Sequence, residues 1–105
     1  MDPVAYTVER WSGDLPPSKT DVLRMIADKG FSGYRWSNYP GDVYGAHNHA
    51  FHKIIFVIQG SITFGLPQEE IQISLNPGDR LDLARGTVHD AIVGAQGVVC
   101  LEIHP

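Results

Sequence analysis

Three of the five histidines in this chain stand at positions from which they could bind one metal ion. His47 and His49 form a His-x-His pair, and in an extended strand two such side chains project from the same face. His89 follows much later, on another expected strand after a turn at Gly86. Neutral imidazole is the commonest metal ligand, and three imidazoles with an open coordination position are typical of a catalytic site. The alternative is three hydrogen-bonded histidines that hold no metal.

Composition and charge limit what such a site could serve. A chain of 105 residues with 43% hydrophobic and 19% charged residues is typical of one globular domain. The net charge of −4 argues against nucleic acid and against an anionic membrane as partners. Cys100 is the single cysteine, so no internal disulfide is expected, and a reducing, cytoplasmic location fits. We see no signal peptide and no apolar run long enough to span a membrane.

One helix is expected, over residues 18–29. Ser18 is a good N-cap, and Asp21 lies near the positive end of the helix dipole. Apolar residues then recur at helical spacing, and Gly30 stands at the C′ position. We expect this helix to pack against the outside of a sheet.

Short strands separated by turns make up the rest of the chain. Residues 39–42 and 76–79 both place Pro-Gly at the centre of a four-residue turn, which is the type II signature. Gly60 fits a tight hairpin. This pattern predicts an all-β sandwich or barrel. The expected strands are 34–39, 53–59, 61–66, 70–75, 80–84, 88–93 and 98–103.

Strand alternation predicts which side chains share a face. If the strand is unbroken, His47, His49, Phe51 and Lys53 project to one side, and His52 projects to the other. His52 is therefore expected at the surface, as is His104.

The residues around these histidines resemble the first conserved motif of the cupin superfamily, which is Gly, five residues, His-x-His, three or four residues, Glu, six residues, Gly. This chain has Gly41, His47, His49, Lys53 and Gly60 at those positions, with matching spacing throughout. The one departure is Lys53, which stands where the family has a glutamate ligand.

A second cupin motif is Gly, five residues, Pro, one residue, Gly, two residues, His, three residues, Asn. Gly78, Gly86 and His89 keep it, whereas Ala84 and Val93 replace its Pro and Asn. The resemblance covers roughly residues 41–93. It implies a single-domain cupin jelly-roll β-barrel over 1–105, with residues 1–30 as an N-terminal extension and 31–105 as the barrel. It also implies one divalent metal ion, Fe, Mn, Zn or Ni, bound by His47, His49 and His89.

Lys53 is the candidate catalytic residue, and three roles are open to it. It could be neutral and act as a base or nucleophile. It could pair with a carboxylate, for which Glu102 and Asp90 are candidates by position. It could remain charged and help the metal to bind an anionic substrate. A bulge near His52 could instead turn Lys53 outward into solvent.

Two functions are open. The first is an enzyme, a three-histidine dioxygenase or an isomerase that acts on a small oxygen-bearing molecule. The second is a cupin that binds or senses a small ligand and uses the metal as a structural element. Cupins often pair through their sheets, so a homodimer is expected. Tyr34 and Trp36 could line the barrel mouth, and Cys100 is expected in the core.

Overall fold

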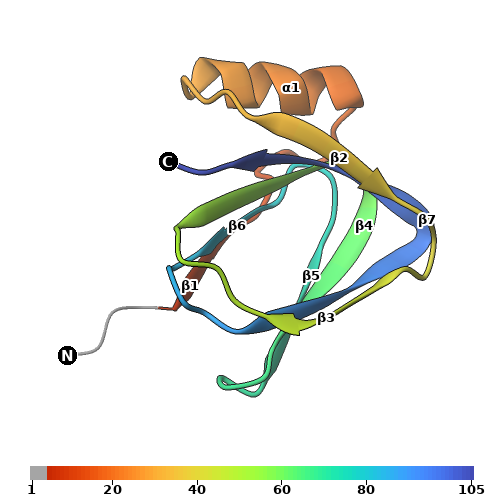
Figure 1. Cartoon of the computed structure of the whole chain (residues 1–105). Helices are drawn as coiled ribbons and strands as arrows, with labels where there is room; N and C mark the ends of the chain where they lie inside the picture. The colour runs from red at the N-terminus through yellow and green to blue at the C-terminus, as the bar shows by residue number, and fades with distance from the viewer. Residues whose placement is uncertain (1–4) are drawn as a thin grey trace.

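A computed structural model describes residues 5–105, which form seven strands and one helix. The strands pair antiparallel and curve around a common interior, with the helix lying across the outside, as Figure 1 shows. In chain order the elements are β1 (Tyr6–Glu9), α1 (Lys19–Asp28), β2 (Tyr34–Asn38), β3 (Val43–His47), β4 (Lys53–Leu66), β5 (Ile71–Leu75), β6 (Arg80–Leu83) and β7 (His89–Ile103). The predicted all-β barrel with one short helix is confirmed.

Two long strands, β4 and β7, pair with each other and connect the two sides of the barrel. The first part of β4 also pairs with β6, and its second part pairs with β5. The first part of β7 pairs with β3, and its second part pairs with β2. Residues far apart in sequence therefore meet on these two strands.

The predicted hairpin at Gly60 is wrong, because β4 continues through this residue. Gly60 has a φ of 79°, but the register of β4 against β7 shifts on both sides of it, so the chain bends without reversing. Gly97 also has a positive φ, 77°, and precedes Val98, which is the cross-strand partner of Gly60 on β7. A Cβ at Gly60 would stand only 2.0 Å from the Gly97 carbonyl oxygen, so the paired strands β4 and β7 can lie this close only with glycine here.

The strand expected through the His-x-His pair is interrupted. β3 ends at His47 and β4 begins at Lys53, and the intervening residues form a loop that contains His49. The Gly86 amide donates a hydrogen bond to the His49 carbonyl oxygen at 2.8 Å, which ties this loop to the turn before β7. The common face of His47 and His49 therefore comes from the loop and not from one continuous strand.

The N-terminal extension contributes a strand that the sequence pattern did not reveal. β1 pairs with β6, from Tyr6 opposite Leu83 to Glu9 opposite Arg80. Tyr6 and Val8 pack against the interior core, which explains why this segment is held in the sheet. The barrel thus begins before residue 31.

The helix agrees with its predicted bounds to within one residue at each end. Ser18 and Asp21 form a capping box, and Lys29 is the C-cap. Val22 and Ile26 are buried against Phe56 and Leu101 on the outer face of the sheet. This hydrophobic cluster covers the outer face of β4 and β7, so the helix does not occupy the barrel interior. No helix within residues 5–105 is long and apolar enough to cross a membrane.

Both predicted Pro-Gly turns form. Gly41 and Gly78 have φ values of 77° and 91°, as the third residue of a type II turn requires. The closing hydrogen bonds run from Asp42 to Tyr39 at 3.1 Å and from Asp79 to Asn76 at 3.0 Å.

Candidate metal centre

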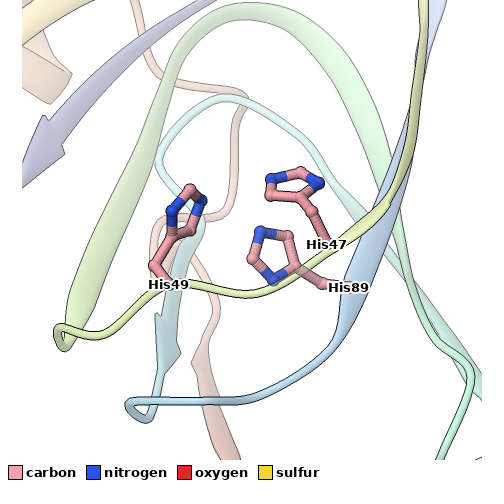
Figure 2. Close-up of side chains that lie close together, drawn as sticks. All are labelled: His47, His49 and His89. Atoms are coloured by element: carbon pink, nitrogen blue, oxygen red, sulfur yellow. The ribbon is translucent and has the colours of Figure 1, made fainter.

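The three predicted histidines meet at one end of the barrel. His47 and His89 are cross-strand partners on β3 and β7, and His49 reaches the same point from the following loop. Figure 2 shows the three rings turned toward one another. One nitrogen of each lies within 4.8 Å of the others. Nitrogen ligands at about 2.1 Å from one ion in a tetrahedral arrangement lie about 3.4 Å apart, so the rings would move inward to bind it.

Backbone carbonyl groups orient two of the rings. Nδ1–H of His47 donates to the Gly45 carbonyl oxygen at 2.7 Å, and Nδ1–H of His89 donates to the Thr87 carbonyl oxygen at 3.0 Å. A carbonyl can only accept, so the proton of each neutral ring lies on Nδ1 and the lone pair lies on Nε2. Such outer hydrogen bonds fix the tautomer and direction of metal-binding histidines.

The Nε2 atoms of His49 and His89 are buried without a hydrogen-bond partner in the described residues. An unsatisfied buried polar atom costs about 1–3 kcal/mol, so proteins seldom leave two of them side by side. A divalent ion bound by Nε2 of all three rings would satisfy both atoms. The donor set therefore fits a metal such as Fe, Mn, Zn or Ni, which imidazole binds readily.

The protonation of the rings also suits metal binding. Burial lowers the pKa of His49 and of His89, and the nearby charge of Lys53 acts in the same direction. The neutral form is the one that binds a metal. His89 is 3% exposed, so it is the most enclosed of the three.

The histidines form part of the wall of a cavity of about 330 Å³. This volume is at the low end for small-molecule sites. One part of the wall is polar and another is apolar. The lining residues are Tyr34, Trp36, Tyr44, His47, His49, Lys53, Ile62, Phe64, His89, Ala91 and Glu102.

Lys53 lies on this cavity wall and pairs with Glu102. The Lys53 Nζ stands 3.2 Å from Glu102 Oε1, and the two side chains are only 13% and 7% exposed. Of the two carboxylates considered from the sequence, Glu102 is thus the partner and Asp90 is not. The ion pair requires Lys53 as an ammonium, which argues against a neutral base or nucleophile.

Three further side chains donate to Glu102. The Tyr34 hydroxyl donates to Oε2, Trp36 Nε1 donates to Oε1 at 3.1 Å, and His104 Nε2 lies 2.7 Å from Oε2. Burial by itself raises the pKa of Glu102, but the hydrogen bonds from Tyr34 and His104 and the charge of Lys53 outweigh burial and leave the pKa below its usual value. Burial is the main cause that raises the pKa of Tyr34 to about 12, and the contact with Glu102 is the second cause.

The lowered pKa of Glu102 predicts how stability depends on pH. Because the carboxylate is favoured in the folded state, it contributes stability above its ordinary pKa of 4.5, and that contribution is lost as the pH falls through the lower folded value. The difference in unfolding free energy between wild type and Glu102→Gln is therefore expected to shrink as the pH falls from 5.5 through 4.5 and below. Urea unfolding across this range measures it, and a difference that does not change with pH would contradict the assignment.

Other predicted residues lie as follows. His52 is outside the cavity, with Nε2 3.7 Å from Asp82 Oδ2. Cys100 is fully buried in the core, and burial raises its thiol pKa to about 12. Tyr34 and Trp36, which could line the barrel mouth or pack in the core, line the cavity.

His104 is exposed, as predicted, but its contact with Glu102 was missed. Cys100, Glu102 and His104 alternate along β7 and just beyond it, so strand alternation alone places Glu102 and His104 on one face. This alternation could have predicted the contact.

Comparisons with solved structures support the same fold. A cupin superfamily protein from Desulfitobacterium hafniense matches with a TM-score of 0.60 and 18% identity, over 67% of this chain and 62% of its own length. A DUF861 family protein from Thermotoga maritima matches with a TM-score of 0.65 and 10% identity, over 95% of this chain and 99% of its own. Acireductone dioxygenase from Bacillus anthracis, with a cadmium ion in its active center, matches with a TM-score of 0.60 and 16% identity, over 94% and 77%.

The chain therefore has the cupin fold, with a three-histidine cluster that could bind a metal inside it. It spans less than two thirds of the Desulfitobacterium protein. No protein-family profile matches the sequence, and no curated protein matches it.

Proposed function

We propose that this chain is a metal-dependent cupin enzyme that binds and activates a small oxygen-bearing molecule in the barrel cavity. The observation that carries the proposal is the pair of buried, unpartnered Nε2 atoms of His49 and His89, which lie beside His47 on the wall of a cavity. Dioxygenase chemistry is the favoured version, and isomerisation is its variant. The likeness to acireductone dioxygenase, whose active center holds a cadmium ion, supports the dioxygenase version, and a likeness to the QdtA 3,4-ketoisomerase supports the variant.

Each part of the site has a role in this proposal. His47, His49 and His89 would hold the ion, and a bound divalent ion would supply Lewis-acid chemistry, or redox chemistry in the case of iron. Lys53 would orient the substrate through its ammonium group. The apolar side chains on the cavity wall would exclude water from the reacting group.

Turnover by the reconstituted protein tests the proposal. The protein is loaded separately with iron, manganese, nickel and zinc and mixed with small hydroxy acids, oxo acids, diketones and thiols. Oxygen uptake reports dioxygenase activity, and proton NMR reports isomerisation. Turnover that is lost in His49→Ala and kept in His52→Ala is the expected result. Tight retention of a small molecule by every metal form, without turnover, would contradict it.

That contradicting result would favour the second candidate, a cupin that binds or senses a small ligand around a structural metal. The observation that favours this candidate is the Lys53–Glu102 ion pair, since each group neutralises the other and neither is a free base. Native mass spectrometry of the purified protein would detect a retained ligand.

We also propose a homodimer and a cytoplasmic location. Val43 and Ile92 are cross-strand partners on the outer face of β3 and β7 and are 71% and 50% exposed, which would suit a contact between two copies. Sedimentation velocity at micromolar concentration is expected to give twice the chain mass, and a monomer would contradict the dimer.

The free, buried Cys100 is consistent with a reducing compartment, and a fluorescent fusion imaged in the source cell tests the location.

A further inference from the structure

The charges around the cavity do not balance a bound divalent ion. Lys53 and Glu102 cancel each other across 3.2 Å. The three imidazoles bind a metal as neutral groups and add no charge. Glu102 is the only acid among the described residues that line the cavity. A divalent ion held here would therefore keep its full charge, which the glutamate of the cupin motif, replaced by Lys53, would have reduced.

Glu102 is fully engaged and is not free to bind the ion. Its Oε1 faces Lys53 and Trp36, and its Oε2 faces Tyr34 and His104. A carboxylate has about four lone-pair sites, and these four groups occupy them. A negatively charged molecule that enters the cavity would balance the charge of the ion.

The Lys53 ammonium group has N–H donors left to contact such a molecule. An ammonium group has three N–H donors, and Glu102 takes one of them. Glu102 is itself held by Tyr34, its cross-strand partner on β2, and by Trp36. Because the carboxylate cannot move away, it positions the ammonium on the cavity wall with donors to spare.

The rest of the wall limits the size and shape of the molecule. Since a water takes about 30 Å³ of liquid, a cavity of about 330 Å³ has room for an organic molecule of about ten heavy atoms. Ile62, Phe64 and Ala91 give the wall an apolar part that would suit a carbon skeleton.

We propose, on the basis of the proposed function, that the site selects a small organic anion, a carboxylate or an enolate with an apolar body. Lys53 contacts the negative charge, and Glu102 is the positioning residue that holds Lys53. The selection depends on the charge of the molecule more than on its shape, because the Lys53 ammonium and the divalent metal ion would both face one cavity.

Matched anionic and neutral probes test this selection. Zinc-loaded protein is titrated calorimetrically with acetate, pyruvate and benzoate and with their neutral amides, and zinc content is measured first by plasma mass spectrometry. We expect the anions to bind more tightly than the amides. In Lys53→Met the anions are expected to bind about 10- to 100-fold more weakly, as for loss of a charged hydrogen bond. Amide binding and zinc content are expected to stay unchanged.

Two variants control the experiment. Lys29→Met removes a lysine outside this cavity and is expected to bind the anions as the wild type does. If Lys53→Met fails to fold because Glu102 is left unpaired, the double variant Lys53→Met/Glu102→Gln removes both charges and is expected to show the same loss of anion binding.

The possible failures are distinguishable. Zinc-loaded wild type that binds anions no more tightly than amides would overturn this inference alone. Full anion affinity in Lys53→Met would do the same. A wild-type protein that takes up none of iron, manganese, nickel and zinc would overturn the proposed function and this inference together.

Discussion

A His89→Ala variant is expected to bind a divalent metal ion at least about 100-fold more weakly than the wild-type protein. Loss of an outer hydrogen-bond partner already costs about 10- to 100-fold in metal affinity, so loss of a ligand should cost more. His89 is the buried member of the cluster, and its Nδ1–H is fixed by the Thr87 carbonyl group. Competition with a chromogenic zinc chelator at pH 7.5 measures the change.

Two further variants make this result specific. His47→Ala removes the most exposed of the three histidines, so it is expected to lose affinity similarly without emptying a buried space. His52→Ala changes a histidine that pairs with Asp82 outside the cavity and is expected to keep wild-type affinity. Equal zinc affinity in His89→Ala and His52→Ala would show that the cluster does not bind the ion.

Replacing Glu102 by alanine is expected to lower the free energy of unfolding by about 3–5 kcal/mol, the usual cost of removing one partner from a buried ion pair. The substitution leaves the Lys53 ammonium buried at 13% exposure without its carboxylate. It also removes the acceptor for Trp36 and Tyr34. Urea unfolding at pH 7 followed by circular dichroism measures the loss.

Glu69→Ala is the matched control, because Glu69 is an exposed acid in the turn between β4 and β5. Its replacement is expected to change stability by no more than about 0.5 kcal/mol. A loss below about 1 kcal/mol in Glu102→Ala would mean that water replaces Glu102 at these donors and that the ion pair is not a structural requirement.

The histidine cluster could be predicted because its three residues belong to two short sequence motifs, in which the spacing between the residues is fixed. His47, His49 and His89 lie near glycines that determine where the chain turns, and the motif spacing holds even though His49 sits in a loop and not in a strand. The prediction of a common face was therefore right about which residues meet and wrong about the backbone that brings them together.

The surroundings of Lys53 depend on pairings that one sequence does not display. Tyr34 meets Glu102 only because β2 pairs with β7 in a particular register. Periodicity identifies the face of a strand, whereas register depends on the whole barrel. Glu102 could thus be proposed as one of two partners for Lys53, but its contacts with Tyr34 and Trp36 could not.

The missed features at Gly60 and β1 have a related cause. A glycine with positive φ is compatible with a hairpin or with a bulged bend, and the packing of Gly60 against Gly97 decides for the bend. β1 is only four residues long and lies at the edge of the sheet, so its alternation is too short to stand out from an irregular segment.

The metal content of the wild-type protein tests most directly whether the three histidines form a metal site. The untagged chain is purified, stripped with a chelator, reconstituted separately with iron, manganese, nickel and zinc, desalted, and analysed by inductively coupled plasma mass spectrometry beside His49→Ala. A three-histidine site predicts close to one equivalent of at least one of these metals in the wild type and almost none in the variant. Wild-type protein that retains none of the four metals would show that the three histidines do not form a metal site.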